Sequence, residues 1–533
     1  MTLQDFLQAQ QLIFCHLVAG DDNLFAAPEA VLVFGVKDET HWVITHEDTE
    51  QIELLRLFAA AEERVFIFEH AQSHMRRLLH WNIHVSRPIC QNVIHRLLEL
   101  SPPSGEAFRS TQEAQRHMES SRQTFSQSQE ALHSSPYKNV ARLECLASSA
   151  FAHMEYRGLY VDQQVWRNIL KDEEEKKAAA ESEFFSAAKP HVKIDLFGRP
   201  DISLEQDEAL RELFEKLTGE SLNRLDKKTL RGLEHPAAKA LIKYRESAKL
   251  VSTYGEGFLQ NIHASTGRIH AHFNPLGTST GRVSCHSPNI QNLPTDERFH
   301  QAICAPPNKC LVTADYATCE LRVLAALSGD KSFLGAFEKD EDLHSRVASE
   351  MFQTSVSKHE NAHLRQRAKA INFGLIYGMG HRALARQVGV GEDEAKILLK
   401  QYFDAYPGIA SFLEHSVSKA KSNGFAATVL NRRLYLEPSD NQLSRIAKNM
   451  PIQGTSAEIA KLAMARLNER LWRDHPDAFL VNMIHDELVV ECPKEDGETI
   501  GQIVVEEMEK AQRTLLPSVK PKADVHVGHT WGH

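Results

Sequence analysis

The chain has 533 residues, of which 42% are hydrophobic, so it is long enough to form several domains with packed cores. Its net charge of −10 argues weakly against nucleic-acid binding, although an acidic total is compatible with cations confined to one DNA track. The eight cysteines form no CxxC pair and the N-terminus has no signal-like pattern, which argues against zinc, disulfides and secretion.

Residues 1–138 begin with a pattern of short apolar runs. These runs predict strands at 31–36 and 40–46, a helix at 51–63 and another strand at 64–70. The triplet Asp48-Thr49-Glu50 lies between the second strand and the helix, where we expect Asp48 or Thr49 to cap the helix. Ser- and Gln-rich sequence at about 101–136 predicts a polar connector that is partly helical.

Two distant segments each place acidic residues after an apolar, β-branched run. LVTADYATCELR at 311–322 contains Asp315, and VNMIHDELVVE at 481–491 contains Asp486 and Glu487. Each run predicts a strand that delivers a carboxylate to its end, where a buried charge is costly unless a cation lies beside it. One or two carboxylates, with substrate phosphates as further ligands, suit Mg2+, and two such ions can clamp an in-line phosphoryl displacement. A surface hairpin at 485–487 and a helix N-cap at Asp315 are the alternatives.

A third segment, RQRAKAINFGLIYGMG, lies between those two at 365–380. Arg365, Lys369, Phe373 and Tyr377 are four residues apart, so on a helix they form one slowly drifting stripe of two cations and two rings. Cations suit a triphosphate and flat rings suit a base or sugar, so one helix is able to contact both halves of a nucleotide. The alternative is an amphipathic helix with buried rings and solvated cations.

Together these segments resemble motifs A, B and C of family A DNA polymerases, the DNA polymerase I-like group. The resemblance runs from about residue 139 to the C-terminus, and four more blocks agree in order and spacing: TSTGRVSCHSPNIQNLP at 278–294, EDLHSRVASEMF at 341–352, RIAKNMPIQGTSAEIAKLAM at 445–464 and the ending VGHTWGH. It implies an α+β right-hand polymerase at 139–533, with a thumb at about 150–262, a palm at about 263–340 and 436–533, and fingers at about 341–435.

The resemblance also implies roles for individual residues. Asp315 and Asp486 match the metal-binding aspartates, the backbone carbonyl of Tyr316 is a further ligand, and Glu487 supports the metal site. Lys369 is also placed to protonate the leaving pyrophosphate. The positions that match nucleotide-binding residues are Arg365, Lys369, His344, Phe373, Tyr377 and Glu320. The positions that match contacts to primer, template or the minor groove are Arg282, Arg445, Asn449, Gln453 and His485.

Choice of sugar is implied by two of these positions. The glutamate that matches Glu320 lies where a 2′-hydroxyl would collide with it, so the resemblance implies selection of deoxynucleotides. Phe373 in place of Tyr implies discrimination against dideoxynucleotides. An ion pair with Arg322 is the alternative for Glu320. Thr318 departs from the commoner Gln and is too short to reach the minor groove, which leaves fidelity open.

The strand-strand-helix-strand order of residues 1–138 resembles a small α/β ribonuclease H-like domain of the 3′-to-5′ exonuclease type. Such nucleases need carboxylates from several segments to hold two metals. Here His74 falls near the second-motif aspartate, the segment at 88–100 lacks an acidic residue at its start, and Asp48-Thr49-Glu50 follows the second predicted strand instead of the first. We therefore expect a degenerate domain without proofreading, and no 5′ nuclease activity.

These features predict a template-directed, DNA-dependent DNA polymerase that adds dNTPs to a primer 3′-OH by two-metal-ion phosphoryl transfer. The expected cofactor is Mg2+ (two ions), with Mn2+ as a substitute. Expected partners are primer-template DNA and dNTPs, with no membrane, for a monomer in the cytoplasm of a bacterium, associated with its nucleoid, or of the host of a phage. A catalytically idle DNA clamp and a related RNA polymerase or primase are the alternatives.

Overall fold

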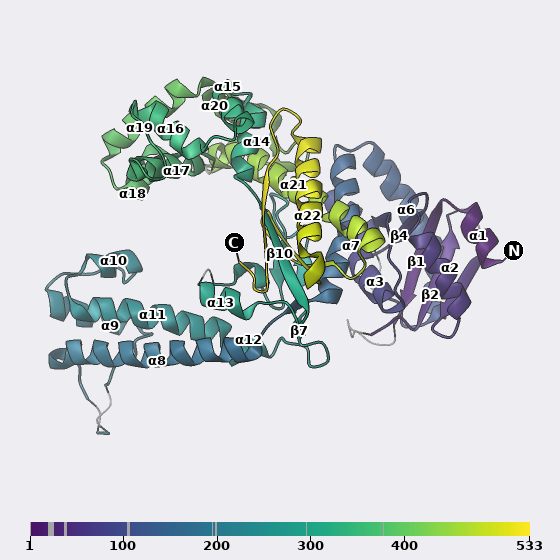
Figure 1. Ribbon diagram of the computed structural model, residues 1–533, viewed down its shortest axis with the longest axis horizontal. Coiled ribbons are helices and arrows are strands. Elements are labelled where there is room, and N and C mark those ends of the chain that lie inside the picture. Colours follow the sequence, from purple (N-terminus) through teal and green to yellow (C-terminus); the bar gives the residue numbers. More distant parts are fainter. Residues whose placement is uncertain are drawn as a thin grey trace. The chain divides into compact units, whose positions relative to one another are not determined.

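Figure 1 shows the computed structural model of the chain. It describes residues 2–19, 26–36, 40–103, 107–194, 196–197, 200–294, 296–376 (at 376 the backbone alone) and 378–532. Two compact units are present. The larger unit comprises residues 1–159, 270–292 and 305–533, and the smaller unit comprises residues 160–269 and 293–304.

A five-stranded sheet with the order β3-β2-β1-β4-β5 forms the N-terminal part of the larger unit. β2 is antiparallel to both β1 and β3, whereas β4 is parallel to both β1 and β5. The predicted strands at 31–36, 40–46 and 64–70 and the predicted helix at 51–63 are confirmed as β2, β3, β4 and α2. The elements are β1 (Leu12–Val18), β2 (Ala30–Gly35), β3 (His41–Thr45), α2 (Thr49–Ala59), β4 (Val65–Phe68) and β5 (Pro88–Cys90).

The central strand of this sheet, β1, is the element that the sequence does not reveal. All its residues except the first are buried, because the sheet is covered on both faces, and a two-sided strand lacks polar alternation. Cys15 and Leu17 belong to one core cluster with residues of α2 and α3, whereas Phe14 packs on the other face with Phe125 of α6. The additional helices here are α1 (Leu3–Ala9), α3 (Ala71–Leu78), α4 (Gln91–Leu97), α5 (Thr111–Arg116) and α6 (Met118–His133).

The expected helix cap before α2 is only partly correct. Asp48 occupies the N-cap position, but its carboxylate makes no capping hydrogen bond. It accepts instead from the backbone N–H of Thr45 at 2.8 Å and from the Thr45 hydroxyl at 2.9 Å. Two donors on one preceding residue therefore compete successfully with the helix amides for this carboxylate.

A four-stranded antiparallel sheet with the order β13-β14-β10-β15 forms the second sheet of the larger unit. α22 packs on β10 and β15 and also on α21, while α7 packs on α21 and β13 (Figure 1). β10 lies between β14 and β15, and the packing of α22 on it helps to bury its apolar residues. The elements are α7 (Lys138–Arg157), β10 (Lys309–Tyr316), α21 (Leu443–Asp474), β13 (Phe479–Ile484), β14 (Glu487–Pro493), α22 (Gly497–Leu515) and β15 (Ala523–Gly528).

A run of helices follows the end of β10. Within it, α17 packs against α14, α16 and α21. These helices are α14 (Cys319–Ser328), α15 (Lys331–Glu338), α16 (Leu343–Phe352), α17 (Ala362–Ile376), α18 (His381–Val388), α19 (Glu392–Ala405) and α20 (Pro407–Asn423). Two small antiparallel ribbons complete the larger unit: β8 (His272–Asn274) with β9 (Ser284–His286), and β11 (Phe425–Ala427) with β12 (Arg433–Tyr435).

The smaller unit is mainly helical. Its two longest helices, α8 and α11, pack along each other, and their core includes Phe184, Phe214 and Leu241. Its elements are α8 (Gln163–Ala188), α9 (Asp207–Thr218), α10 (Lys227–Gly232), α11 (Pro236–Tyr254), α12 (Glu256–Leu259), β7 (Arg268–Ile269) and α13 (Glu297–Ala302). In the part of the chain that the structure describes, no helix has both the length and the apolar character required to cross a membrane.

Candidate active site

The two aspartates singled out in the sequence lie at one edge of the β10 sheet. Asp315 is the penultimate residue of β10, and its register partner is Glu487, the first residue of β14. β13 and β14 form a hairpin whose two-residue turn is His485 and Asp486, and the Tyr316 N–H donates to the carbonyl of Asp486 at 3.4 Å. Residues 485–487 do form a hairpin, but the alternative of a surface hairpin is only partly correct because Glu487 is buried. The N-cap alternative for Asp315 is wrong, because Thr318 occupies the N-cap position of α14.

Electrostatics at this edge favour a cation. The pKa of Asp486 is raised to about 6, mainly by burial and also by the negative charges of Asp315 and Glu320, whereas the charge of Arg282 opposes the rise. Among the described residues, no group of three or more His, Cys, Asp or Glu side chains is arranged to hold a metal ion alone. A two-aspartate site therefore fits Mg2+, which needs only one or two carboxylates when substrate phosphates supply further ligands.

The side chain of Glu487 is held by a hydrogen bond from Trp531, near the C-terminus. That side chain is buried, and the indole Nε1–H of the buried Trp531 donates to its Oε1 at 2.7 Å. Tyr316 is fixed in a comparable way, because its hydroxyl donates to the carbonyl of Met508 in α22 at 2.7 Å. No role for Trp531 was predicted from the sequence, although the residue lies in the ending VGHTWGH that resembles the family.

Glu320 lies in the first turn of α14 and is almost fully buried. Its carboxylate accepts from the guanidinium of Arg282 at 2.5 Å. Arg322, the alternative partner, donates instead to the backbone carbonyls of Ala317 and Lys520. Glu320 therefore connects the first turn of α14, just after β10, to the loop that carries Arg282.

The predicted stripe lies on α17. Arg365 donates to the carboxylate of Asp342, the N-cap residue of α16, at 2.6 and 3.2 Å. Lys369 is exposed, and among the described residues it has no ion-pair partner. Phe373 is half-buried, with its ring centroid 5.8 Å from that of His344. Tyr377 lies outside the described residues.

His344 differs from the expectation that it acts as a cation. It is buried in α16, and Asn372 of α17 lies within hydrogen-bonding distance of its Nδ1 at 3.0 Å. The pKa of His344 is lowered to about 4, mainly by burial and also by the charges of Arg365 and Lys369, whereas the charge of Asp342 opposes the fall. The imidazole is therefore neutral at pH 7 and offers a hydrogen bond instead of a charge.

The remaining predicted residues line α21 and the hairpin turn. Arg445, Asn449 and Gln453 are four residues apart on α21, so they share one face of the helix. Arg445 is exposed and donates to Gln442, while Asn449 and Gln453 are half-buried. His485 lies at the hairpin turn, where its residue is largely exposed but its ring is partly shielded from water, and this shielding together with the charge of Arg282 lowers its pKa. The structure thus brings His485, Arg282 and the aspartates into one neighbourhood.

Asp315 and Asp486 meet at the end of an antiparallel sheet, and α17 in the following run of helices carries Arg365, Lys369 and Phe373, which is the arrangement of the right-hand polymerase class. The family model described as DNA polymerase family A matches residues 163–533, and the chain belongs to this family. The predicted family and the α+β right-hand fold are therefore confirmed.

Similar proteins of known name agree with this placement. DNA polymerase I of Bacillus caldotenax is 33% identical over 404 residues, covering 74% of this chain and 46% of the relative. The thermostable DNA polymerase I of Thermus aquaticus is 32% identical over 405 residues, covering 72% and 47%. The chain thus spans about half the length of these relatives.

A solved structure resembles nearly the whole chain. The POL domain of Pol1 from M. smegmatis, in complex with DNA primer-template and dNTP, has a TM-score of 0.80 and 25% sequence identity. The match covers 99% of this chain and 98% of that one, so it includes the N-terminal sheet as well as the polymerase part.

Proposed function

We propose that the chain is a template-directed DNA polymerase that adds dNTPs to the 3′-hydroxyl of a primer. The observation that carries this proposal is the meeting of Asp315 and Asp486 at one sheet edge, although 170 residues separate them in sequence. The relation to DNA polymerase I and the likeness to a structure with primer-template and dNTP support the same substrates.

In the proposed reaction Asp315, Asp486 and the Tyr316 carbonyl hold divalent ions, for which we infer Mg2+, with Mn2+ as a substitute. When bound, Mg2+ neutralises the phosphates and favours deprotonation of the primer hydroxyl. Lys369, which is exposed, neutralises the triphosphate and donates a proton to the leaving pyrophosphate. Arg365 uses Nε and Nη2 on Asp342, so Nη1 remains for a phosphate oxygen.

The other side chains are proposed to select the substrate. Glu320 blocks a 2′-hydroxyl, and Phe373 and Tyr377 shape the pocket for the new base pair. Arg282 and Gln453 test the minor-groove acceptors that every correct pair presents, so the enzyme needs no sequence preference. Arg445, Asn449 and His485 contact primer or template, and Glu487 supports the metal site.

Primer extension tests the proposal. Asp486→Ala should lower turnover at least about a thousandfold while leaving primer-template affinity within about threefold of wild type, because the loss is confined to transition-state stabilisation. Asp404→Ala, at an exposed carboxylate on α19 that pairs with Lys400, is the matched control and should extend normally. Failure of the wild-type chain to extend a primer with dNTPs and Mg2+ would contradict the proposal, and extension with NTPs alone would reassign it to RNA synthesis.

We also infer that the N-terminal sheet has no nuclease activity. β1 contains no acidic residue, and the Asp48 carboxylate is bound to Thr45. A labelled primer with a mismatched 3′ end should therefore not be shortened in the absence of dNTPs. Trimming that persists in Asp486→Ala would show that this sheet is an active exonuclease. We further propose a monomer that acts in the cytoplasm.

A further inference from the structure

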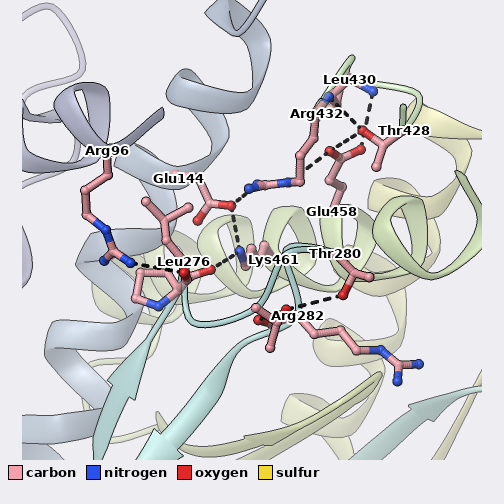
Figure 2. A network of polar contacts seen from close by, with 12 residues as sticks. Arg96, Glu144, Leu276, Thr280, Arg282, Thr428, Leu430, Arg432, Glu458 and Lys461 are labelled. Atoms are coloured by element: carbon pink, nitrogen blue, oxygen red, sulfur yellow. Dashed lines mark hydrogen bonds and ion pairs between the residues drawn. The ribbon is translucent and has the colours of Figure 1, made fainter. Parts of the chain in front are cut away.

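Four charged residues from distant parts of the larger unit meet in its interior (Figure 2). Glu144 comes from α7, Arg432 from the turn before β12, and Glu458 and Lys461 from α21. Their exposed fractions are 0% for Glu144, 5% for Arg432, 1% for Glu458 and 0% for Lys461. Removing a charge from water costs several kcal/mol unless the charge is paired. The pairs within this cluster connect α7, α21 and the turn before β12.

Glu144 is the counterion that two cations share. Its Oε1 accepts from the Lys461 ammonium at 2.6 Å and also from the guanidinium of Arg432. Burial lowers the pKa of Lys461 to about 8, and the charge of Glu144 opposes this fall, so Glu144 helps to keep the lysine protonated at neutral pH. Replacement of Glu144 by a neutral residue would leave Glu458, whose Oε1 lies 3.7 Å from Nε of Arg432, to balance two buried cations.

Both cations also hold the loop at 275–282, which connects β8 to β9 and carries Arg282. Lys461 donates to the carbonyl of Pro275 at 2.7 Å. At the other end of the loop, Gly281 has φ +85°, and a Cβ built there would lie 2.5 Å from Nε of Arg432. The loop is therefore bonded to Lys461 at Pro275 and packed closely against Arg432 at Gly281, and both of these side chains donate to Glu144. Figure 2 shows Lys461 and Arg432 converging on Glu144.

The same loop rests on α21 beside Gln453. A Cβ on Gly454 would lie 2.9 Å from the carbonyl oxygen of Thr280, so the loop backbone and the helix are in close contact. Glu458, one turn further along α21, accepts from the Thr428 hydroxyl at 2.6 Å and from the Leu430 N–H at 3.3 Å. These bonds hold the turn from which Arg432 projects.

We propose that Glu144 is a positioning residue for Arg282. Through Lys461 and Arg432 it determines the position of the 275–282 loop relative to α21. The loop in turn places Arg282 beside Glu320 and at the minor-groove side of the primer terminus. This inference rests on the proposed polymerase function. It extends the selection machinery to a buried carboxylate that touches neither nucleotide nor DNA.

A double-mutant cycle tests the inference. Glu144→Gln and Arg282→Ala should each lower the rate of correct insertion by about tenfold and reduce the preference for matched over mismatched primer ends. If Glu144 acts through Arg282, adding Glu144→Gln to Arg282→Ala should cost less than about twofold more. Multiplicative losses, near a hundredfold for the pair, would overturn the inference.

Glu507→Gln is the matched control, because Glu507 is also buried and also shared by two cations, Arg466 and Arg470, away from the 275–282 loop. It should lower the Tm as Glu144→Gln does but leave the matched-to-mismatched ratio unchanged. Equal loss of that ratio in both variants would reduce Glu144 to a stability role. If Glu144→Gln does not fold, Glu144→Gln with Lys461→Met removes one charge of each sign and enters the same cycle.

Amide hydrogen exchange separates this inference from the proposed function. Residues 275–282 should exchange faster in Glu144→Gln than in wild type, whereas Glu507→Gln should leave their exchange unchanged. Unchanged exchange of these residues in Glu144→Gln would overturn the inference even in an active enzyme. Faster exchange in a chain that does not extend primers would overturn the polymerase assignment alone.

Discussion

Replacement of Asp486, a proposed metal ligand, should stabilise this protein when no divalent ion is present. Asp486 is half-buried beside Asp315, and its pKa is raised from the ordinary value of 3.8 to about 6. A raised pKa means that the folded state resists ionisation of this group. Asp486→Asn keeps the shape of the side chain and removes the charge, so it should remove that resistance.

The magnitude and the pH range follow from linkage. A step from 3.8 to about 6 corresponds to roughly 3 kcal/mol at about 1.4 kcal/mol per pKa unit, and we expect a gain of about 1–3 kcal/mol because solvent reaches part of the site. The contribution of Asp486 is fully present below pH 3.8 and is lost as the pH rises through about 6. The advantage of Asp486→Asn should therefore be absent near pH 4 and complete near pH 8.

Urea denaturation in EDTA at pH 4, 6 and 8 measures this difference. Added Mg2+ should reverse it, because the wild-type chain gains binding energy that the variant lacks. Asp404→Asn, at an exposed position, should show neither effect. If Asp486→Asn is no more stable than wild type at pH 8 in EDTA, the two aspartates are not in electrostatic conflict and the argument for a cation at this edge fails.

Three further changes probe the surroundings of the site. Trp531→Phe removes the donor to the buried carboxylate of Glu487, so it should lower the free energy of unfolding by about 1–3 kcal/mol and lower kcat only several-fold. An unchanged Tm would contradict the role of Trp531 as the partner of Glu487. The lowered pKa of His344 stabilises the folded state above pH 6.5, and about 3 kcal/mol of this stability is lost as the pH falls through about 4. His344→Asn should remove that loss, which urea titrations of the two proteins at pH 7 and pH 4 would detect. Thr318→Asn should raise the Tm, since Thr318 has φ 56° and Asn tolerates this left-handed conformation at about 1 kcal/mol lower cost; a lower Tm would refute this account of strain.

The strands that carry the aspartates could be predicted because their signals are local. An apolar, β-branched run followed by an acidic residue needs no knowledge of the rest of the chain, and the four-residue spacing of Arg365, Lys369 and Phe373 is equally visible. Pairing of β10 with β14 could not be read in this way. The register that places Asp315 opposite Glu487 depends on backbone hydrogen bonds between strands far apart in sequence, and only family resemblance anticipated it.

Partners of buried charges were missed for the same physical reason. Glu144 and Lys461 are separated by 317 residues, so no periodicity links them. The sequence does contain a weak signal, since Glu458 and Lys461 interrupt the otherwise apolar segment AEIAKLAM at 457–464. Such interruptions indicate buried pairs when a helix is covered on all sides, and solvated residues when it is not. The burial of His344 escaped prediction because a histidine can be either buried or exposed at the same helical position.

Pairing also explains how an acidic protein can present cations to phosphates. Arg282 is held by Glu320 and Arg365 by Asp342, so each guanidinium is held by a carboxylate of a neighbouring element and not by Asp315 or Asp486. Without such partners, two mobile arginines near Asp315 and Asp486 would compete with divalent ions for the same oxygens. The local carboxylates therefore add to the net charge of −10 and at the same time leave Asp315 and Asp486 available for the divalent ions of the proposed reaction.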